Sequence, residues 1–284
     1  MAARRFRQVD VFTATPLAGN PVAVVLDADG IDEATMRRLA AWTNLSETTF
    51  VLPARAPEAS YRLRIFTPRG EIPFAGHPTI GSAHAALEAG LVTPRDGVLR
   101  QECAAGVLPI RIADGHLSVR VPPARLREPS LDRDALAQAL GAPPAGTPRA
   151  VDVGPSWLVV PLADEATVRR LTPDLVAVER IARAADVGGI TVFALCEGAI
   201  AVVVRSFAPG AGVPEDPVCG SGNAAVGAYL GSGGLIARTG ERYRASQGRE
   251  LGREGVVDVV VADEGRTIDI GGHAVTVIAG TLTL

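Results

Sequence analysis

Two short stretches, PFAGHPTIG at residues 73–81 and PVCGSGNAA at residues 217–225, have the same construction. In each, a proline is followed three residues later by a glycine, and a small residue, Ala75 or Cys219, stands directly before that glycine. Each stretch is preceded by a similar segment, RIFTP at 64–68 and RSFAP at 205–209, and the second segment begins 141 residues after the first (64 to 205). Self-similarity at a constant offset indicates duplicated structural units.

Matches elsewhere in the chain keep the same order. VDV occurs at 9–11 and again at 151–153, and TTFVL at 48–52 is loosely matched by TVFAL at 191–195. We therefore expect two similar domains, residues 1–124 and 125–284, joined near the proline-rich stretch VPPARLREP at 121–129. This division allows the last strand to cross back to the first domain.

The local patterns indicate mixed secondary structure. β-Branched segments between turn signals, such as PVAVVL at 21–26 and YRLRIFT at 61–67, are typical of strands. Helical spacing predicts helices over 33–43, 77–90 and 222–234. The third helix is rich in small residues all round, which favours burial inside a wrapping sheet. The predicted fold class is α+β, with two pseudo-symmetric domains that each wrap a β-barrel-like sheet around a central helix.

The composition limits the class of partner and compartment. The 284 residues carry a net charge of −3 without a basic block, so nucleic acid is not an expected partner. The chain has no apolar run of the length needed to cross a membrane and no secretory signal pattern, so we expect no membrane partner. Its three cysteines, Cys103, Cys196 and Cys219, lack zinc-site spacing and fit a reducing cytoplasm.

The repeated motif has a chemical use as well as a structural one. The N–H groups in the first turn of a helix lack internal partners and carry the positive end of the helix dipole. Glycine lets a ligand approach this backbone closely, so each motif can bind a carboxylate. The alternative is that AGHP and CGSG are only tight turns. The duplication favours a site for a small anion.

The longer motifs resemble a known family. VDVFTATPLAGNPVAVVLDADG at 9–30, NLSETTFVLP at 44–53, RIFTPRGEIPFAGHPTIGSAHAAL at 64–87 and EDPVCGSGNAAVGAYL at 215–230 are similar to the phenazine-biosynthesis isomerase (PhzF-like) family. This resemblance covers nearly the whole chain. It implies the diaminopimelate epimerase-like fold, an active site between the domains, no metal or organic cofactor, and a homodimer.

The resemblance also assigns roles to particular residues. It makes Glu47 the general base and acid of a proton shift, and it adds His77 and Asp216 as catalytic residues. Gly76, Gly220 and Ser221 become substrate-binding residues together with Cys219. From the residues alone, Glu47 also fits a solvated surface position, and Asp216 fits a capping role at a helix start. Glu215 is expected to face solvent.

Cys219 separates the competing functions. A thiol at a helix N-terminus has a depressed pKa and can act as a base. The repeat, however, pairs Cys219 with Ala75, so a two-cysteine racemase mechanism is excluded. Three hypotheses remain: an isomerase that moves a proton on a small unsaturated or cyclic carboxylic acid through Glu47, an epimerase that uses Glu47 and Cys219 on opposite faces, and a non-catalytic binder of small acids.

Overall fold

The computed structural model describes residues 2–284, which divide into two compact units. Among the described residues, unit 1 comprises 2–120 and 271–284, and unit 2 comprises 121–270. The chain therefore passes into unit 2 four residues earlier than the sequence division at 124/125. Residues 271–284 lie in unit 1, because the last strand crosses back to it; the sequence division had placed them in the second domain while allowing for this crossing.

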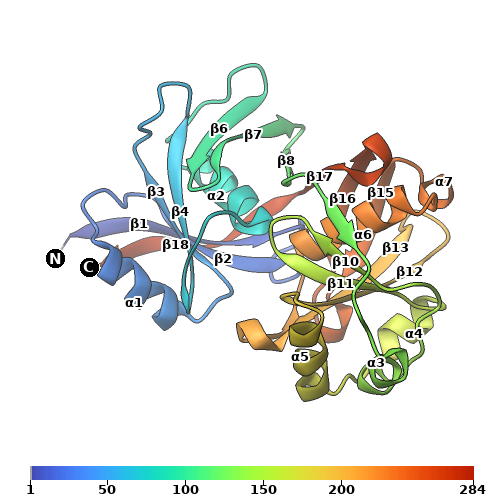
Figure 1. Ribbon diagram of the computed structural model, residues 1–284. Helices are drawn as coiled ribbons and strands as arrows, with labels where there is room; N and C mark the ends of the chain where they lie inside the picture. The colour runs from blue at the N-terminus through green and yellow to red at the C-terminus, as the bar shows by residue number, and fades with distance from the viewer. Residues whose placement is uncertain (1) are drawn as a thin grey trace. The chain divides into compact units, whose positions relative to one another are not determined.

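Unit 1 is a strongly bent sheet with one helix inside and one outside (Figure 1). Its elements are β1 (Ala3–Val11), β2 (Asn20–Val25), α1 (Glu33–Thr43), β3 (Thr48–Leu52), β4 (Tyr61–Thr67), β5 (Gly70–Ile72), α2 (Gly76–Glu88), β6 (Val98–Cys103), β7 (Gly106–Ala113), β8 (His116–Arg120) and β18 (Ala274–Thr283). The C-terminal strand β18 pairs antiparallel with β1, so both ends of the chain lie side by side in this unit (Figure 1).

The central helix of unit 1 is α2, which contacts β1, β2, β3, β4, β8 and β18. Ten of its 13 residues are buried, as the small-residue composition requires. Gly81 is needed for this fit, because a Cβ there would lie 2.4 Å from Val22 Cγ1. Outside the sheet, α1 begins at its cap Asp32, whose carboxylate accepts from Thr35 N, and it buries Met36, Leu39 and Ala40.

Unit 2 repeats this arrangement with additional outer helices. Its elements are β9 (Arg125–Arg127), α3 (Arg133–Leu140), β10 (Arg149–Asp152), β11 (Ser156–Pro161), α4 (Glu165–Arg170), α5 (Leu175–Ala184), β12 (Gly189–Leu195), β13 (Val202–Ala208), η1 (Pro209–Ala211), β14 (Val213–Asp216), α6 (Gly220–Ser232), α7 (Ile236–Thr239), β15 (Arg242–Gln247), η2 (Arg249–Leu251), β16 (Gly255–Ala262), η3 (Asp263–Gly265) and β17 (Thr267–Gly272). The central helix α6 contacts β10, β11, β12, β13 and β16.

Strand pairing shows the duplication directly. In unit 1, β2 is parallel to β3, β3 is antiparallel to β4, and β4 is parallel to β6. In unit 2, β11 is parallel to β12, β12 is antiparallel to β13, and β13 is parallel to β15. The helices α2 and α6 have the same length of 13 residues and occupy the same place in this order. The predicted α+β fold of two pseudo-symmetric halves is therefore confirmed.

The sequence did not anticipate three helices of unit 2. Helices α3, α4 and α5 pack on the outer face of the sheet, where Leu136, Val168 and Val178 are fully buried. Each begins at an aspartate, Asp132, Asp164 or Asp174, whose carboxylate accepts first-turn N–H groups. These helices give unit 2 a second hydrophobic core that does not involve α6.

Candidate active site

Glu47 and His77 form a close pair in unit 1. Glu47 ends the loop before β3, and His77 is the second residue of α2. Glu47 Oε2 lies 3.3 Å from His77 Nε2, and both side chains are largely buried, 14% and 6% exposed respectively. The structure thus excludes the solvated surface position for Glu47. It brings together two of the three residues predicted to be catalytic.

Burial changes the acidity of this carboxyl. Removal from water raises the pKa of Glu47 to about 7, against a smaller opposing effect of its hydrogen bond with Ser46. Both protonation states are then populated near neutral pH. A carboxyl in this condition can remove a proton in one step and return it in the next.

The N-terminus of α2 has no capping side chain. Its N-cap residue, Ala75, has no side-chain hydrogen bond to the first turn, and Pro78 has no N–H. Gly76 and His77 supply the first two N–H groups of the helix. The positive end of the helix dipole therefore lies next to Glu47, where it can attract a small carboxylate.

In unit 2, the loop before α6 is tied to a strand by one glutamine. Gln247, at the end of β15, accepts from Cys219 N at 3.1 Å and from Asn223 Nδ2 at 2.9 Å. Its own Nε2 donates to the carbonyl of Asp216 at 2.9 Å. Gln247 is fully buried, so these hydrogen bonds fix the path of the backbone from Asp216 to Asn223.

Cys219 is the N-cap residue of α6. Its sulfur accepts from Gly222 N at 3.3 Å, which is the role expected of a capping side chain. Asp216 instead accepts from Val218 N at 3.1 Å and closes a turn ahead of the helix. Asn223 does not cap the helix either, because its Nδ2 donates to the Cys219 carbonyl at 2.9 Å.

The expected low pKa of Cys219 is wrong. Burial raises the pKa of this thiol well above its ordinary value, and the neighbouring Asp216 carboxylate raises it further. Hydrogen bonds from Ser221 and Gly222 oppose this shift without reversing it. The thiol is 3% exposed, so desolvation of the thiolate outweighs the helix dipole. Near neutral pH Cys219 is a protonated thiol.

The expectation that Glu215 faces solvent is also wrong. The side chain of Glu215 is 13% exposed and makes a two-pronged ion pair with Arg205, at 2.8 Å for both hydrogen bonds. Arg205 is itself buried and donates to the carbonyls of Val168 and Leu171. Glu215 therefore serves the packing of unit 2.

Ser221 has a partner that the sequence analysis did not identify. The indole Nε1 of Trp157, on β11, donates to Ser221 Oγ at 3.0 Å. Behind the first turn of α6, the hydroxyls of Thr191 and Ser206 lie 3.0 Å apart. A Cβ on Gly222 would lie 2.4 Å from Ser206 Oγ, so only glycine lets the helix start approach this pair.

The predicted residues fall into two groups. Glu47, Gly76 and His77 lie in unit 1, and Asp216, Cys219, Gly220 and Ser221 lie in unit 2. Trp157 and Gln247 are the residues missed. Trp157 gave a weak signal, because GPSWLVVPL at 154–162 loosely matches GNPVAVVL at 19–26, which has Val22 in its place. Gln247 gave none.

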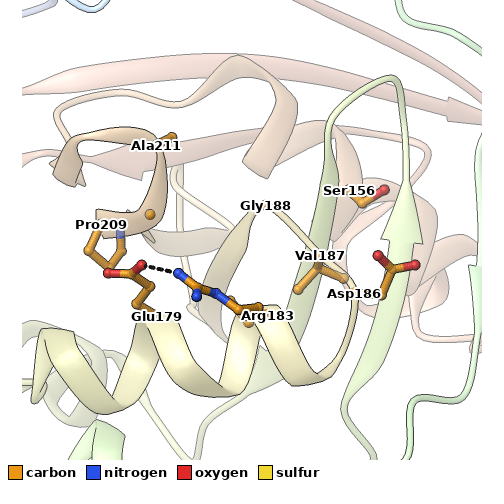
Figure 2. Close-up of a pocket in the computed structure, with 10 residues that line it drawn as sticks. Ser156, Glu179, Arg183, Asp186, Val187, Gly188, Pro209 and Ala211 are labelled. Atoms are coloured by element: carbon orange, nitrogen blue, oxygen red, sulfur yellow. Dashed lines mark hydrogen bonds and ion pairs between the residues drawn. The ribbon is translucent and has the colours of Figure 1, made fainter. Parts of the chain in front are cut away.

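A surface pocket elsewhere in unit 2 contains none of these residues. It has a volume of about 520 Å³ and lies between α5 and η1 (Figure 2). Glu179 and Arg183 of α5 form an ion pair of 2.7 Å at its floor, and Ser156 and Asp186 lie toward its other side (Figure 2). Asp186 is fully exposed, so this pocket is a solvated hollow and gives no basis for a second site.

The described residues, 2–284, contain neither a metal-ligand cluster nor a membrane-spanning helix. No group of three or more histidine, cysteine, aspartate or glutamate side chains is arranged to hold a metal ion within that range. Within the same residues, no helix has the length and apolar character needed to cross a membrane.

Comparison with known proteins agrees with the fold and the motifs. The family model for phenazine biosynthesis-like proteins (PhzC-PhzF) matches residues 9–280. A protein called antisense-enhancing sequence 1 from Schizosaccharomyces pombe is 39% identical, with 99% of each chain covered. An uncharacterized isomerase from Mesorhizobium japonicum is 34% identical over the same shares.

Solved structures give the same result. A PhzF-family phenazine biosynthesis protein from Bacillus anthracis superposes with a TM-score of 0.87, at 27% identity and with 100% of both chains covered. A probable proline racemase from Agrobacterium radiobacter shares the fold, with a TM-score of 0.66 at 17% identity over 99% of this chain and 93% of that one. These matches define an isomerase with an epimerase-like fold. The chain belongs to the phenazine biosynthesis-like (PhzF) family.

Proposed function

We propose that this isomerase moves a proton along a small unsaturated or cyclic carboxylic acid, an allylic shift in which Glu47 is both general base and general acid. The single observation that carries the proposal is the buried Glu47 carboxyl, 3.3 Å from His77 and with a pKa of about 7. In its ionised form Glu47 takes the proton from the acidic carbon, and the double bond shifts. The Glu47 carboxyl then exchanges its proton with solvent and delivers a proton to the far carbon of the allyl system.

The surroundings of Glu47 support this sequence of steps. His77 Nε2 lies 3.3 Å from Glu47 Oε2, and the first N–H groups of α2 at Gly76 and His77 stabilise negative charge that develops on the substrate. Unit 2 has a carboxylate-binding group of its own, the α6 N-terminus at Gly220 and Ser221. In this proposal Asp216 orients groups around that second terminus.

The test uses a panel of small unsaturated and cyclic carboxylic acids in D₂O, followed by NMR. The wild type should place deuterium into at least one acid, and Glu47→Gln should abolish this incorporation while the protein remains folded. Glu47→Asp, which keeps the carboxyl, serves as the matched control and should retain part of the activity. Undiminished incorporation by Glu47→Gln would refute the assignment. Binding of acids without any incorporation by the wild type would favour the non-catalytic binder.

An epimerase that uses Cys219 as its second base receives less support. In the direction in which Cys219 removes the proton it would need a thiolate, and in the other direction its donation of a proton would leave one; burial raises the pKa of that thiol and so disfavours the thiolate in both. Cys219 is also already used as the cap of α6. The proposal therefore rests on one carboxyl.

We further propose the cellular setting that the family resemblance implies. The enzyme acts in the cytoplasm as a homodimer, without a metal or organic cofactor, in a biosynthetic pathway of secondary metabolism. The three cysteines are free, which fits a reducing compartment. Sedimentation equilibrium of the purified protein tests the dimer, and a monomer over the micromolar range would contradict it.

A further inference from the structure

Ser221 is the reachable residue at the start of α6. Gly220, Gly222 and Asn223 are buried, whereas the Ser221 side chain is only partly covered. Its hydroxyl oxygen accepts a hydrogen bond from Trp157 Nε1 at 3.0 Å. An indole N–H can only donate, so this bond uses a lone pair of the serine and leaves the serine proton for another acceptor.

The only other hydrogen-bond contact given for this hydroxyl within residues 2–284 is to Cys219 Sγ, at 3.5 Å. Sulfur is a weak acceptor, and this sulfur already accepts from Gly222 N. If the Ser221 proton points to the thiol, a ligand oxygen can displace that contact at little cost. If the thiol donates to Ser221, the serine proton is directed elsewhere. In both cases Ser221 is a donor toward an incoming group.

The indole is held rigidly. Trp157 is 6% exposed, and its backbone lies opposite Gly189 in the parallel pair of β11 and β12. A Cβ on Gly189 would lie 2.6 Å from Trp157 Cζ3, so the ring packs directly on this glycine. The donor therefore has a fixed direction, and Ser221 is oriented before any ligand binds.

We propose that Trp157 is a positioning residue that fixes the Ser221 hydroxyl as a hydrogen-bond donor, so that the group binding there is an anionic oxygen such as a substrate carboxylate. This inference rests on the proposed function in that it specifies the ligand chemistry at the α6 N-terminus. It predicts a preference: a carboxylate accepts the Ser221 proton, whereas an ammonium group can reach only the lone pair that Trp157 does not use.

The first part of the experiment tests the hydrogen bond without any ligand. The chain has two tryptophans, so protein labelled with ¹⁵N-tryptophan gives two indole N–H signals, assigned through Trp42→Phe and Trp157→Phe. Trp42 is 78% exposed and is the internal control. The Trp157 signal should exchange slowly with solvent and shift in Ser221→Ala, while the Trp42 signal stays in place. A Trp157 signal unaffected by Ser221→Ala would overturn the inference.

The second part measures affinity for a defined probe, cyclohex-1-ene-1-carboxylate, by its effect on the Trp157 signal and by calorimetry. Loss of a hydrogen bond to a charged group predicts that Ser221→Ala weakens binding about tenfold. Trp157→Phe, which keeps a ring but loses the donor, should weaken it severalfold. The double variant should bind no more weakly than Ser221→Ala alone, because the two residues act through one hydroxyl. Ser221→Thr should restore binding.

Additive losses of affinity in the double variant would contradict the positioning role. So would a wild type that does not bind the probe, or one that binds cyclohexen-1-ylmethylammonium as tightly as the carboxylate. These outcomes are separate from a failure of the proposed function. In Glu47→Gln, the Trp157 indole signal and its response to Ser221→Ala should stay as in the wild type, since Glu47 is not part of this hydrogen bond. Loss of proton exchange with intact Trp157–Ser221 coupling would leave the inference in place.

Discussion

Glu47 combines two properties that rarely occur together at a protein surface. Its carboxyl is largely withdrawn from water, and it faces an imidazole at 3.3 Å. Desolvation disfavours the charged form, which raises the pKa to about 7 and brings the carboxyl to the range where a proton can move in either direction near neutral pH. The same burial has a consequence for stability.

A carboxyl whose pKa is raised by folding stabilises the protein at low pH. Below the ordinary pKa of about 4.3 the carboxyl is protonated in both states, and its contribution is fully present. The contribution is lost as pH rises through about 7, the folded-state value. Between pH 4 and 8 this amounts to about 3 kcal/mol in the free energy of unfolding.

Glu47→Gln should remove this loss, because glutamine has no proton to release. Urea unfolding of the wild type and the variant at several pH values measures the difference. As the pH rises, the free energy of unfolding of the variant should increase relative to that of the wild type. Glu58→Gln, at an exposed position, is the control and should follow the wild type. Parallel curves for Glu47→Gln and the wild type would show that Glu47 titrates normally.

Cys219 provides the second prediction at this scale. As an N-cap residue it should be replaceable by serine, which is a preferred cap, whereas Cys219→Ala should cost about 1 kcal/mol. If Glu47 alone moves the proton, Cys219→Ser should keep most of the turnover. Thermal melts and single-turnover assays measure the two effects. Near-complete loss of turnover in a folded Cys219→Ser protein would identify the thiol as a second acid or base.

At the scale of elements, the start of α6 is fixed by contacts on both sides. The start of α6 is held from one side by Gln247 and approaches the hydroxyls of Thr191 and Ser206 on the other. Small residues permit this approach, which explains why the helix lacks an amphipathic pattern. A side chain added at the contact should displace the whole first turn.

Gly222→Ala is the direct test of this close approach. The new methyl group would lie 2.4 Å from Ser206 Oγ and 2.9 Å from Thr191 Oγ1, so we expect a loss of about 1–3 kcal/mol in the free energy of unfolding. Gly227→Ala in the same helix meets no atom closer than 3.1 Å and should cost less. Equal effects in denaturant titrations would mean that loss of helical glycine, and not the contact with Ser206, determines the stability.

Individual elements also show how far sequence reasoning reached. The spacing predicted a helix over 33–43 and α1 spans those residues, because Asp32 and the apolar face are local signals. The central helices were predicted within two residues of their observed starts, from Pro78 and the glycine-rich turns. The environment of Cys219 was not predictable in this way. Its pKa depends on burial under segments far away in the chain.

Tertiary partners explain the other misses. Gln247 and Cys219 are 28 residues apart, and Trp157 and Ser221 are 64 apart. Arg205, whose ion pair buries Glu215, is likewise supplied by a neighbouring strand. The family resemblance supplied Glu47 and His77 as a pair, but only the fold shows that they lie 3.3 Å apart.

At the scale of the whole molecule, each half repeats one strand order around one buried helix, yet the two helix starts differ chemically. Ala75 leaves the α2 terminus without a capping side chain, while Cys219 caps α6. In our proposal Glu47 and His77 of unit 1 supply acid–base groups, and Trp157 of unit 2 holds Ser221 as a donor. The duplicated halves therefore have helix termini with the same place in the fold but with different neighbouring side chains.

The crossing of β18 into unit 1 makes the C-terminus part of the first half. Leu282 and Leu284 pack against the core of unit 1, which includes Met36 and Phe50. Removal of residues 281–284 should therefore destabilise unit 1 by about 2–4 kcal/mol, from lost apolar burial. Hydrogen exchange should speed up in β1 and α1 and stay unchanged in α5. Faster exchange confined to unit 2 would contradict this assignment.

The position of deuterium in the product tests the central claim most directly. The acid identified in the exchange panel is turned over in D₂O, and NMR locates the label. If Glu47 moves a proton along an allyl system, deuterium appears at the far carbon of the shifted double bond in the wild type and is lost in Glu47→Gln. Deuterium at the original carbon with inverted configuration, or unchanged labelling by Glu47→Gln, would contradict a single-carboxyl isomerase.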